Sequence, residues 1–323
     1  MPRLISITDP HQLVELPGNG LSAITPDLLT QHQPDAHWAL VDGDRLLAHC
    51  SLWWQQVPVD RAGLIGHYGA IDRSAAEELL SHACSELAAH GCNLAIAPID
   101  GNTWRRYRAI CDRGNEPLFF LEPGNPPEWC EQFQAAGFAA IAHYYSALNS
   151  DLSQQDLRLE AIGKSRFARL QIRPIAVDRL EAELEAIYQL SLISFQHNFL
   201  YTPIDRAEFF AQYRQVVPLL KPELVLMAEQ NGQLVGFLFA LPDLLAAKRG
   251  AIDTVIIKTV AVLPGREFAG LGSLLVARAQ AIAQSLGYTR AIHALMHETN
   301  RSLNLSRRYA LPMRRYCLFG RSI

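Results

Sequence analysis

The chain has 323 residues, of which 49% are hydrophobic and 19% are charged, and its formal net charge is −3. This balance is typical of globular proteins, leaves room for two domains and argues against intrinsic disorder. Because no broad basic field is present, we expect neither nucleic acid nor an anionic membrane as a partner.

The six cysteines form neither a CxxC pair nor a cluster with the spacing of a zinc site, so no metal is expected. The first ten residues lack the basic and apolar regions of a signal peptide. No run of about 18 apolar residues could cross a bilayer. We therefore expect a cytoplasmic protein whose cysteines remain reduced thiols.

The first half of the chain predicts a series of strands and helices. Hydrophobic patterning and turn signals predict strands at 38–42, 46–54, 64–71, 94–99 and 139–147, and helices at 74–89 and 128–136. Asp42-Gly43-Asp44 is a hairpin signal between the first two strands. Asp72 or Ser74 caps the first helix and Gly91 ends it.

A polar stretch at 149–164 is the predicted linker, and a second series of elements follows it. Strands are expected at 168–174, 224–228, 234–241, 254–262, 291–296 and 315–319, and helices at 180–195, from near Ile204, at 273–286 and at 300–309. Asn231-Gly232 predicts a tight hairpin, because both residues tolerate positive φ.

The order hairpin, strand, helix, strand, helix, strand occurs twice, which indicates a divergent internal duplication. Two unrelated α+β domains could share so short an order by chance. The predicted architecture is α/β (α+β), with domains at 1–150 and 165–323. Each domain is expected to be a mixed, mostly antiparallel sheet flanked by helices.

Residues 259–275 carry the most informative motif. A β-branched strand ends in a turn at Pro264, and Gly270-x-Gly272 then opens a helix. Glycines let the backbone approach a bulky anion, and the unpaired N–H groups at a helix start favour phosphate. No third glycine follows at the dinucleotide spacing, and no Gly-Lys-Ser/Thr follows, so dinucleotide and triphosphate loops are excluded.

Val260-Ala261-Val262-x-Pro264 followed by Gly270-Leu271-Gly272-x-Leu274-Leu275 resembles motif A of the GNAT N-acetyltransferases. The resemblance implies that the strand contacts the pantetheine arm of acetyl-CoA through Val260 and Val262. It also implies a set of residues that hold the CoA pyrophosphate: Arg266, Glu267, Ala269, Gly270, Gly272 and Ser273. Glu267 stands where the family has Arg or Gln. We expect Glu267 to point outward while Arg266 takes its role, the alternative being a weaker affinity.

Residues 300–310 resemble motif B of the same family, which implies Asn300 at the start of a helix and a tyrosine that protonates the departing thiolate. Counting back from Ala310 places that tyrosine at Ser306, whereas Tyr309 lies three residues later on about the same helix face. Tyr309 is the favoured general acid, with Ser306 or water as alternatives. Tyr309 could equally be an aromatic side chain that packs the last turn.

The sequence does not assign the general base or the residues that line the acceptor site. The candidate bases, none at a position that matches the family, are His293, His297, Glu298, Glu229 and Asp243. A chain of water molecules could replace all of them. The resemblance implies that residues 194–203 form a wall of the acceptor site, although their aromatic residues could simply fill the core.

The N-terminal half also resembles a GNAT domain, through residues 102–108 and 122–127 and through Gly137-Phe138. It lacks the Gly-x-Gly, and Asp72 adds a negative charge there, so we expect a degenerate half that does not bind CoA in the usual way. It could build the acceptor pocket, brace the other half or bind a partner. Arg105, Arg106 and Arg108 could meet an anion or form a solvated face.

The resemblance implies an N-acetyltransferase that moves an acetyl group directly from acetyl-CoA to the primary amine of a small molecule or an amino terminus. No metal is needed, and a homodimer is compatible with this reading. A non-catalytic acyl-CoA-binding scaffold or sensor is the alternative. Transfer to an amino acid or an aminoacyl-RNA is a third reading, and the absent basic field argues against RNA.

Overall fold

The computed structural model describes residues 1–12, 21, 24–154, 163, 165–299, 306 and 308–323. In the first half the strands are β1 (Arg3–Ser6), β2 (Ala36–Asp42), β3 (Arg45–Trp53), β4 (Ala62–Ala70), β5 (Leu94–Ala97), β6 (Ala109–Asp112) and β7 (Ala139–Asn149). The helices of this half are α2 (Pro26–His32), α3 (Arg73–Ala89) and α4 (Trp129–Ala135).

In the second half the strands are β8 (Gln171–Pro174), β9 (Val225–Gln230), β10 (Gln233–Pro242), β11 (Thr254–Val262), β12 (Arg290–His297) and β13 (Leu311–Ser322). The helices are α6 (Leu180–Phe195), α7 (Arg206–Val216) and α8 (Leu271–Ser285). Short 3-10 helices are η1 (Val177–Arg179), η2 (Val217–Leu219), η3 (Pro222–Leu224) and η4 (Leu244–Lys248).

The predicted elements recur with small shifts at their ends. The bounds of α6 and β11 agree with the prediction, and the predicted hairpin forms at Asn231 and Gly232, whose φ angles are 52° and 79°. Helix α8 begins at Leu271, two residues earlier than expected, because Gly270 is its N-cap. Most of the predicted helix 300–309 lies outside the described residues.

The last strand is longer than the sequence predicted. β13 extends from Leu311, and Pro312 therefore lies inside it rather than before it. Pro312 pairs with Ala147 beside a register shift between Pro312 and Arg314. A proline has no N–H to give to a sheet, and such an irregularity accommodates it.

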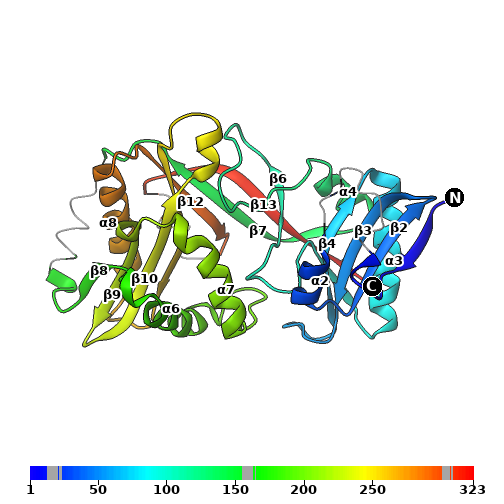
Figure 1. Ribbon diagram of the computed structural model, residues 1–323, viewed down its shortest axis with the longest axis horizontal. Coiled ribbons are helices and arrows are strands. Elements are labelled where there is room, and N and C mark those ends of the chain that lie inside the picture. Colours follow the sequence, from blue (N-terminus) through cyan, green and yellow to red (C-terminus); the bar gives the residue numbers. More distant parts are fainter. Residues whose placement is uncertain (13–20, 22–23, 155–162, 164, 300–305, 307) are drawn as a thin grey trace.

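The two halves share one continuous sheet, which the sequence did not indicate. Its strand order in the described residues is β1-β2-β3-β4-β5-β13-β7-β12-β11-β10-β9-β8, with β6 paired to β13. β13 leaves its own half and pairs antiparallel with β5, while β7 pairs with β12 of the second half. β7 and β13 are therefore exchanged, and they form the diagonal connection between the lobes in Figure 1.

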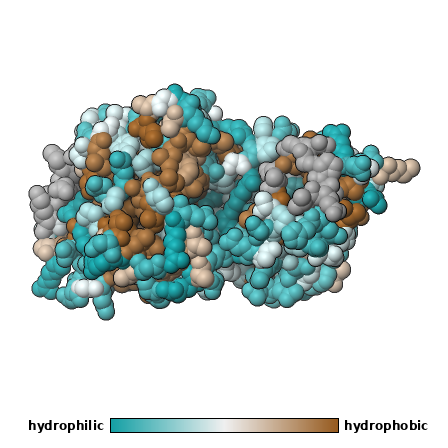
Figure 2. Space-filling model, viewed as in Figure 1, coloured by the Kyte–Doolittle hydropathy of each residue, from teal (hydrophilic) through white to brown (hydrophobic). Residues whose placement is uncertain are grey.

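Helices cover both faces of the sheet in the second half. On one face α8 buries Leu271, Leu274 and Leu275. On the other face α6 and α7 bury Ile187 and Phe209. Apolar side chains gather over the side of this lobe that faces the viewer in Figure 2, whereas the visible face of the other lobe is mostly hydrophilic.

The core cluster beneath α6 and α7 includes residues from the first half of the chain. Phe119 is 1% exposed within the α6–α7 cluster, and Trp104 and Phe120 pack against it. The Trp104 indole N–H donates to the Thr202 carbonyl at 2.8 Å. Residues 104–120 therefore form part of the wall of the second half on its α6–α7 face.

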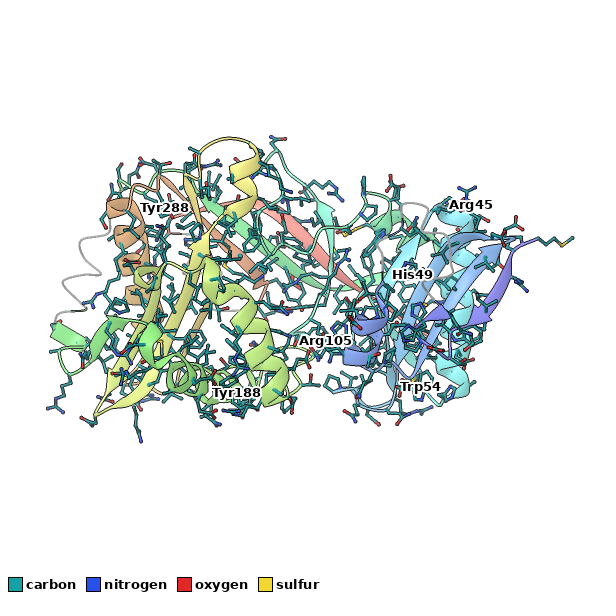
Figure 3. All side chains as sticks on the ribbon, viewed as in Figure 1. Arg45, His49, Trp54, Arg105, Tyr188 and Tyr288 are labelled. Carbon is teal, nitrogen blue, oxygen red and sulfur yellow. A yellow bond between two sulfur atoms is a disulfide. The ribbon has the colours of Figure 1, made fainter. Side chains whose placement is uncertain are left out.

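Ion pairs also join this region of the first half to β13 and to α7. Arg314 on β13 bonds the Glu122 carboxylate at 2.5 Å, and the two side chains are 2% and 0% exposed. Arg105 makes a two-pronged ion pair with Glu208 of α7, at 2.7 Å and 3.0 Å. Figure 3 shows Arg105 between the two lobes. The junction is therefore fixed by charges as well as by strands.

The expectation that all cysteines are free thiols is wrong for one pair. Cys111, on β6, and Cys130, on α4, form a disulfide. Their separation of 19 residues carries no local signal, because a disulfide needs only that the fold bring two Cα atoms close. Cys50, Cys84, Cys92 and Cys317 are free and buried.

Candidate active site

The parallel strands β11 and β12 separate part-way along their length. They pair from Thr254 with Arg290 to Ile257 with His293, and the recorded pairing ends there. β11 carries a bulge at the next residue, Lys258, where its register against β10 shifts. Beyond this point the described residues of the two strands are not paired with each other, which defines the opening between them.

The edge of β11 at this opening is made by Val260 and Val262. The Val262 carbonyl accepts a hydrogen bond from Ser194 Oγ of α6 at 3.1 Å, so it points away from β10. The next residue points the other way, since the Leu263 N–H donates to the Val235 carbonyl of β10. By this alternation the backbone of Val260 also faces the opening.

The N-terminus of α8 lies directly after this edge and has no side-chain cap. Gly270 is the N-cap with φ 95°, and Gly265 at the start of the loop has φ 158°. The loop is exposed at Arg266, Glu267, Ala269 and Gly270, while Phe268 is buried beneath it. Uncapped N–H groups at the positive end of a helix favour a bound anion.

Two charged side chains shape this loop. The Glu267 carboxylate folds toward Gly265, where its oxygens lie 2.7 Å from the place that a Cβ would occupy. Arg166, which sequence reasoning missed, donates to the Arg266 carbonyl at 2.9 Å. Arg166 therefore adds a cation to the loop from the segment before β8, where no local motif marks it.

The predicted motif B residues are only partly described. Asn300 lies outside the described residues. Ser306 is buried, and the backbone N–H groups of Tyr309 and Ala310 both donate to its carbonyl at 2.9 Å. Its hydroxyl has no hydrogen-bond partner among the residues that the structure describes. Tyr309 is half-buried. The roles of all three residues stay predictions.

Three of the candidate bases make structural contacts. Glu229 pairs with Arg173. Asp243 accepts the Phe120 N–H at 2.8 Å and pairs with Arg249. Glu298 accepts the His143 N–H at 3.2 Å. A carboxylate that already binds a cation or a backbone amide is less available as a base.

The two candidate histidines both lie on β12. His293 stands at the last pair with β11, and burial lowers its pKa to about 4. His297 bonds the Thr299 hydroxyl at 2.9 Å, and burial lowers its pKa as well. Both rings are therefore neutral near pH 7, which is the protonation state that a base requires.

Lys258 is a functional candidate that sequence reasoning missed. It is the bulged residue of β11, and its ammonium donates to the Leu121 carbonyl at 3.1 Å. Burial lowers the pKa of Lys258 to about 7, with a smaller contribution from Arg108. The only signal in the sequence was a lysine within a run of β-branched residues.

The equivalent place in the first half is filled by its own side chains. β4 and β5 pair in parallel from Ala62 with Leu94 to Leu64 with Ile96, and β4 then bulges at His67, whose φ is 44°. The His67 N–H donates to Asp100 at 2.6 Å. Asp72 caps α3 by accepting the Ala75 N–H at 2.9 Å. The His67 and Ala75 N–H groups are thus already engaged by side chains of the first half.

A chain of buried side chains surrounds that bulge. His67 hydrogen-bonds His32 at 2.8 Å and the Ser51 hydroxyl at 2.8 Å, and Ser51 hydrogen-bonds His37 at 2.7 Å. Burial lowers the pKa of His67 to about 3 and that of His32 to about 4. The fold therefore holds these rings neutral.

The lowered pKa values of His67 and His293 predict a loss of stability in mild acid. The folded-state pKa values of His67 and His293 lie below the ordinary value of 6.5, so their contribution is complete above that pH and is lost as the pH falls toward 4. We expect each to cost about 1 kcal/mol per pH unit below 6.5. Thermal unfolding at pH 7.5, 6.0 and 5.0 measures this, and a midpoint that does not change would contradict it.

The arginines at 105, 106 and 108 do not form a solvated face. Arg105 pairs with Glu208, and Arg106 donates to the Gly124 carbonyl and lies over the Trp129 ring. Arg108 donates to the Leu295 carbonyl at 3.1 Å. All three guanidinium groups are held within the molecule, and only Arg108 reaches β12 next to the opening.

Comparison with known proteins agrees with the motif. Residues 184–309 match the sequence profile described as Acetyltransferase (GNAT) family. Residues 184–309 therefore form a GNAT-family domain within the second half of the chain. Acyl transfer is the general reaction of that family. The matched range includes the open edge of β11 and the loop that begins α8.

Solved structures show the same fold over the whole chain. One is a glucosamine N-acetyltransferase region of a fungal multi-domain β-N-acetylglucosaminidase, at 13% identity and a TM-score of 0.58, with 99% of this chain and 38% of that chain covered. This chain therefore spans well under half of that protein. No curated protein sequence matched the chain.

Two further GNAT structures resemble the chain over nearly their full length. A tandem GNAT protein from the clavulanic acid biosynthesis pathway has 14% identity and a TM-score of 0.52, with 100% of this chain and 98% of that chain covered. A GCN5-related N-acetyltransferase from Sphaerobacter thermophilus has 11% identity and a TM-score of 0.51, with 99% and 95% covered. At these identities the likeness establishes the tandem GNAT fold alone.

Two further properties concern the described part of the chain. No helix there is both long and apolar enough to cross a membrane. Among the same residues, no group of three or more His, Cys, Asp or Glu side chains is arranged to hold a metal ion.

Proposed function

We propose that the protein transfers an acetyl group from acetyl-CoA to a primary amine by direct attack. The observation that carries this proposal is the uncapped N-terminus of α8, placed directly after the open edge of β11. An acyl-CoA needs an open strand edge for the arm that carries its thioester and, directly after it, a helix N-terminus for its diphosphate. The family match of residues 184–309 supports acyl transfer in general.

In this proposal the loop holds the CoA pyrophosphate and β11 holds the pantetheine arm. The N–H groups of residues 266–273 donate to the pyrophosphate, and Arg266 supplies a positive charge. Backbone groups of Val260 and Val262 bond the arm. The Val260 N–H polarises the thioester carbonyl, as an oxyanion donor does.

Proton transfers complete the reaction. The acceptor amine must lose a proton before it attacks, and the neutral histidines His293 and His297 or a chain of water molecules can accept it. The thiolate of CoA then takes a proton from Tyr309, from Ser306 or from water. Catalysis relies mainly on holding two substrates in one cleft.

The first half supplies one wall of the acceptor side in this proposal. Trp104 bonds Thr202 within the segment 194–203, and Leu121 bonds Lys258 on β11. Trp104 and Phe120, the neighbour of Leu121, pack on the face that carries α6 and α7. The amine would therefore enter between the two halves, opposite the α8 face.

A cytoplasmic location remains part of the proposal. Four free buried cysteines agree with a reducing compartment. The Cys111–Cys130 disulfide does not, because such bonds are rare in the cytosol.

Release of free thiol tests the proposal. Purified protein, acetyl-CoA and a panel of primary amines are incubated at pH 8, and thiol is followed with a chromogenic disulfide, with amine-free protein as the hydrolysis control. We expect amine-dependent thiol release. Acetyl-CoA binding with no release for any amine would favour a non-catalytic acyl-CoA-binding protein instead.

A further inference from the structure

One cation at the opening between β11 and β12 has a free binding edge. Arg108 comes from the first half, is 7% exposed and reaches the second half by donating Nη1 to the Leu295 carbonyl. Its Nε is buried and has no hydrogen-bond partner among the residues that the structure describes. No hydrogen bond joins its Nη2 to any of those residues either.

The position of this guanidinium is set from both sides. Leu295 lies on β12 beyond the last pair with β11, at φ 60°. The rings of Tyr107 and Tyr144 lie 3.8 Å and 4.3 Å from the guanidinium carbon. Two aromatic faces and one carbonyl therefore orient the Arg108 side chain. The edge formed by Nε and Nη2 makes no hydrogen bond to the described residues and can bind a ligand.

The surrounding carboxylates are already engaged. Glu122 lies near Lys258 but is paired with Arg314 and also accepts from Tyr316. Glu298, which follows β12, accepts the His143 N–H. In the described part of the chain no ion pair joins Arg108 or Lys258 to a carboxylate. Neither Arg108 nor Lys258 is therefore neutralised by direct contact with a carboxylate of the described residues.

A buried guanidinium cannot lose its proton, so an unmatched charge there is costly unless a ligand anion neutralises it. The Nε–Nη2 edge of arginine presents two parallel donors, the geometry that binds a carboxylate with both oxygens. Backbone amides at α8 already serve the phosphates of CoA in the proposed function. The second anion must then come from the acceptor.

We propose that Arg108 binds the carboxylate of the acceptor, so that the substrates are primary amines that carry a carboxylate, as amino acids do. Lys258, on the opposite side of the opening, adds a second cation or a second donor to the same group. This proposal rests on the proposed function, since it assigns the substrate class of that site. It also gives the first half a direct part in substrate selection.

Binding of the acetylated products tests the proposal without any need for turnover. Full-length protein saturated with CoA is titrated with N-acetylglycine, N-acetylalanine, N-acetylleucine and N-acetylphenylalanine, each beside its carboxamide. Ligand-observed NMR and calorimetry report binding. We expect at least one acid to bind about tenfold or more tightly than its amide, as for a lost charge-assisted pair.

Variants assign that preference to one residue. Arg108→Met should remove the preference of acid over amide, and Arg108→Lys should retain only part of it. Arg106→Met is the matched control, because Arg106 is also held by a carbonyl and an aromatic ring. That variant should keep the preference. Circular dichroism checks that all three variants fold.

The other possible outcomes contradict either the carboxylate site or acetyl transfer, and each outcome shows which of these two proposals fails. Equal binding of acids and amides, binding of neither, or a preference that survives Arg108→Met overturns the carboxylate site. Binding of acids that requires Arg108, with no thiol release from any amine, overturns acetyl transfer and leaves the carboxylate site standing.

Discussion

Gly270→Val is expected to weaken acetyl-CoA binding by about 100-fold or more. Gly270 has φ 95° and forms the N-cap of α8, with no heavy atom within 4 Å of the place a Cβ would occupy. A β-branched side chain there would project into the space that the pyrophosphate needs. Loss of two charge-assisted hydrogen bonds, each worth about 1.5–3 kcal/mol, accounts for a factor of this size.

Gly287→Val is the matched control for that substitution. Gly287 has φ 93° just after the other end of α8, and it too has no heavy atom within 4 Å. Both variants should lose about 1–2 kcal/mol of stability through backbone strain. Calorimetry with acetyl-CoA should separate them, and equal affinities in the two variants would remove the loop from the binding site. The double substitution of Gly270 and Gly272 should abolish binding altogether.

The separate halves 1–150 and 165–323 are expected not to fold. β13 lies between β5 and β7, and its side chains Tyr316, Leu318 and Phe319 are at most 1% exposed. Without the second half, β5 keeps β4 but loses its other neighbour, β13, and these buried contacts. Without the first half, β12 loses β7 and exposes an unpaired edge that invites aggregation.

Co-expression should restore a soluble complex of the two halves, because the exchanged strands then find their partners. Size-exclusion chromatography and thermal unfolding measure this. A full-length chain cut by a protease at a site introduced between residues 150 and 165 is the control and should remain associated. A cooperative unfolding transition in either half alone would contradict the exchange of β7 and β13.

Local signals explain why most helices and strands were predicted. The turn at Asn231-Gly232 and the cap at Asp72 act over a few residues, so the sequence shows them directly. The exchange of β7 and β13 is not a local property. An alternating strand can pair with either half, and only the packing of the whole chain decides between them.

The candidate site also contains features that local sequence reveals and features that only the fold reveals. The edge of β11 and the loop at Gly270 are contiguous in sequence, so a motif reveals them. Arg108 and Lys258 are 150 residues apart, and only the fold brings their charges to one opening. The disulfide between Cys111 and Cys130 was missed for the same reason.

The central claim is that one half of the chain binds acetyl-CoA. Calorimetric titration of the full-length protein with acetyl-CoA, beside NADH as a control ligand, tests it most directly. The account predicts one site per chain, no binding of NADH and loss of that site in Gly270→Val. Absence of acetyl-CoA binding to folded protein would contradict the account, and two sites per chain would contradict the degenerate first half.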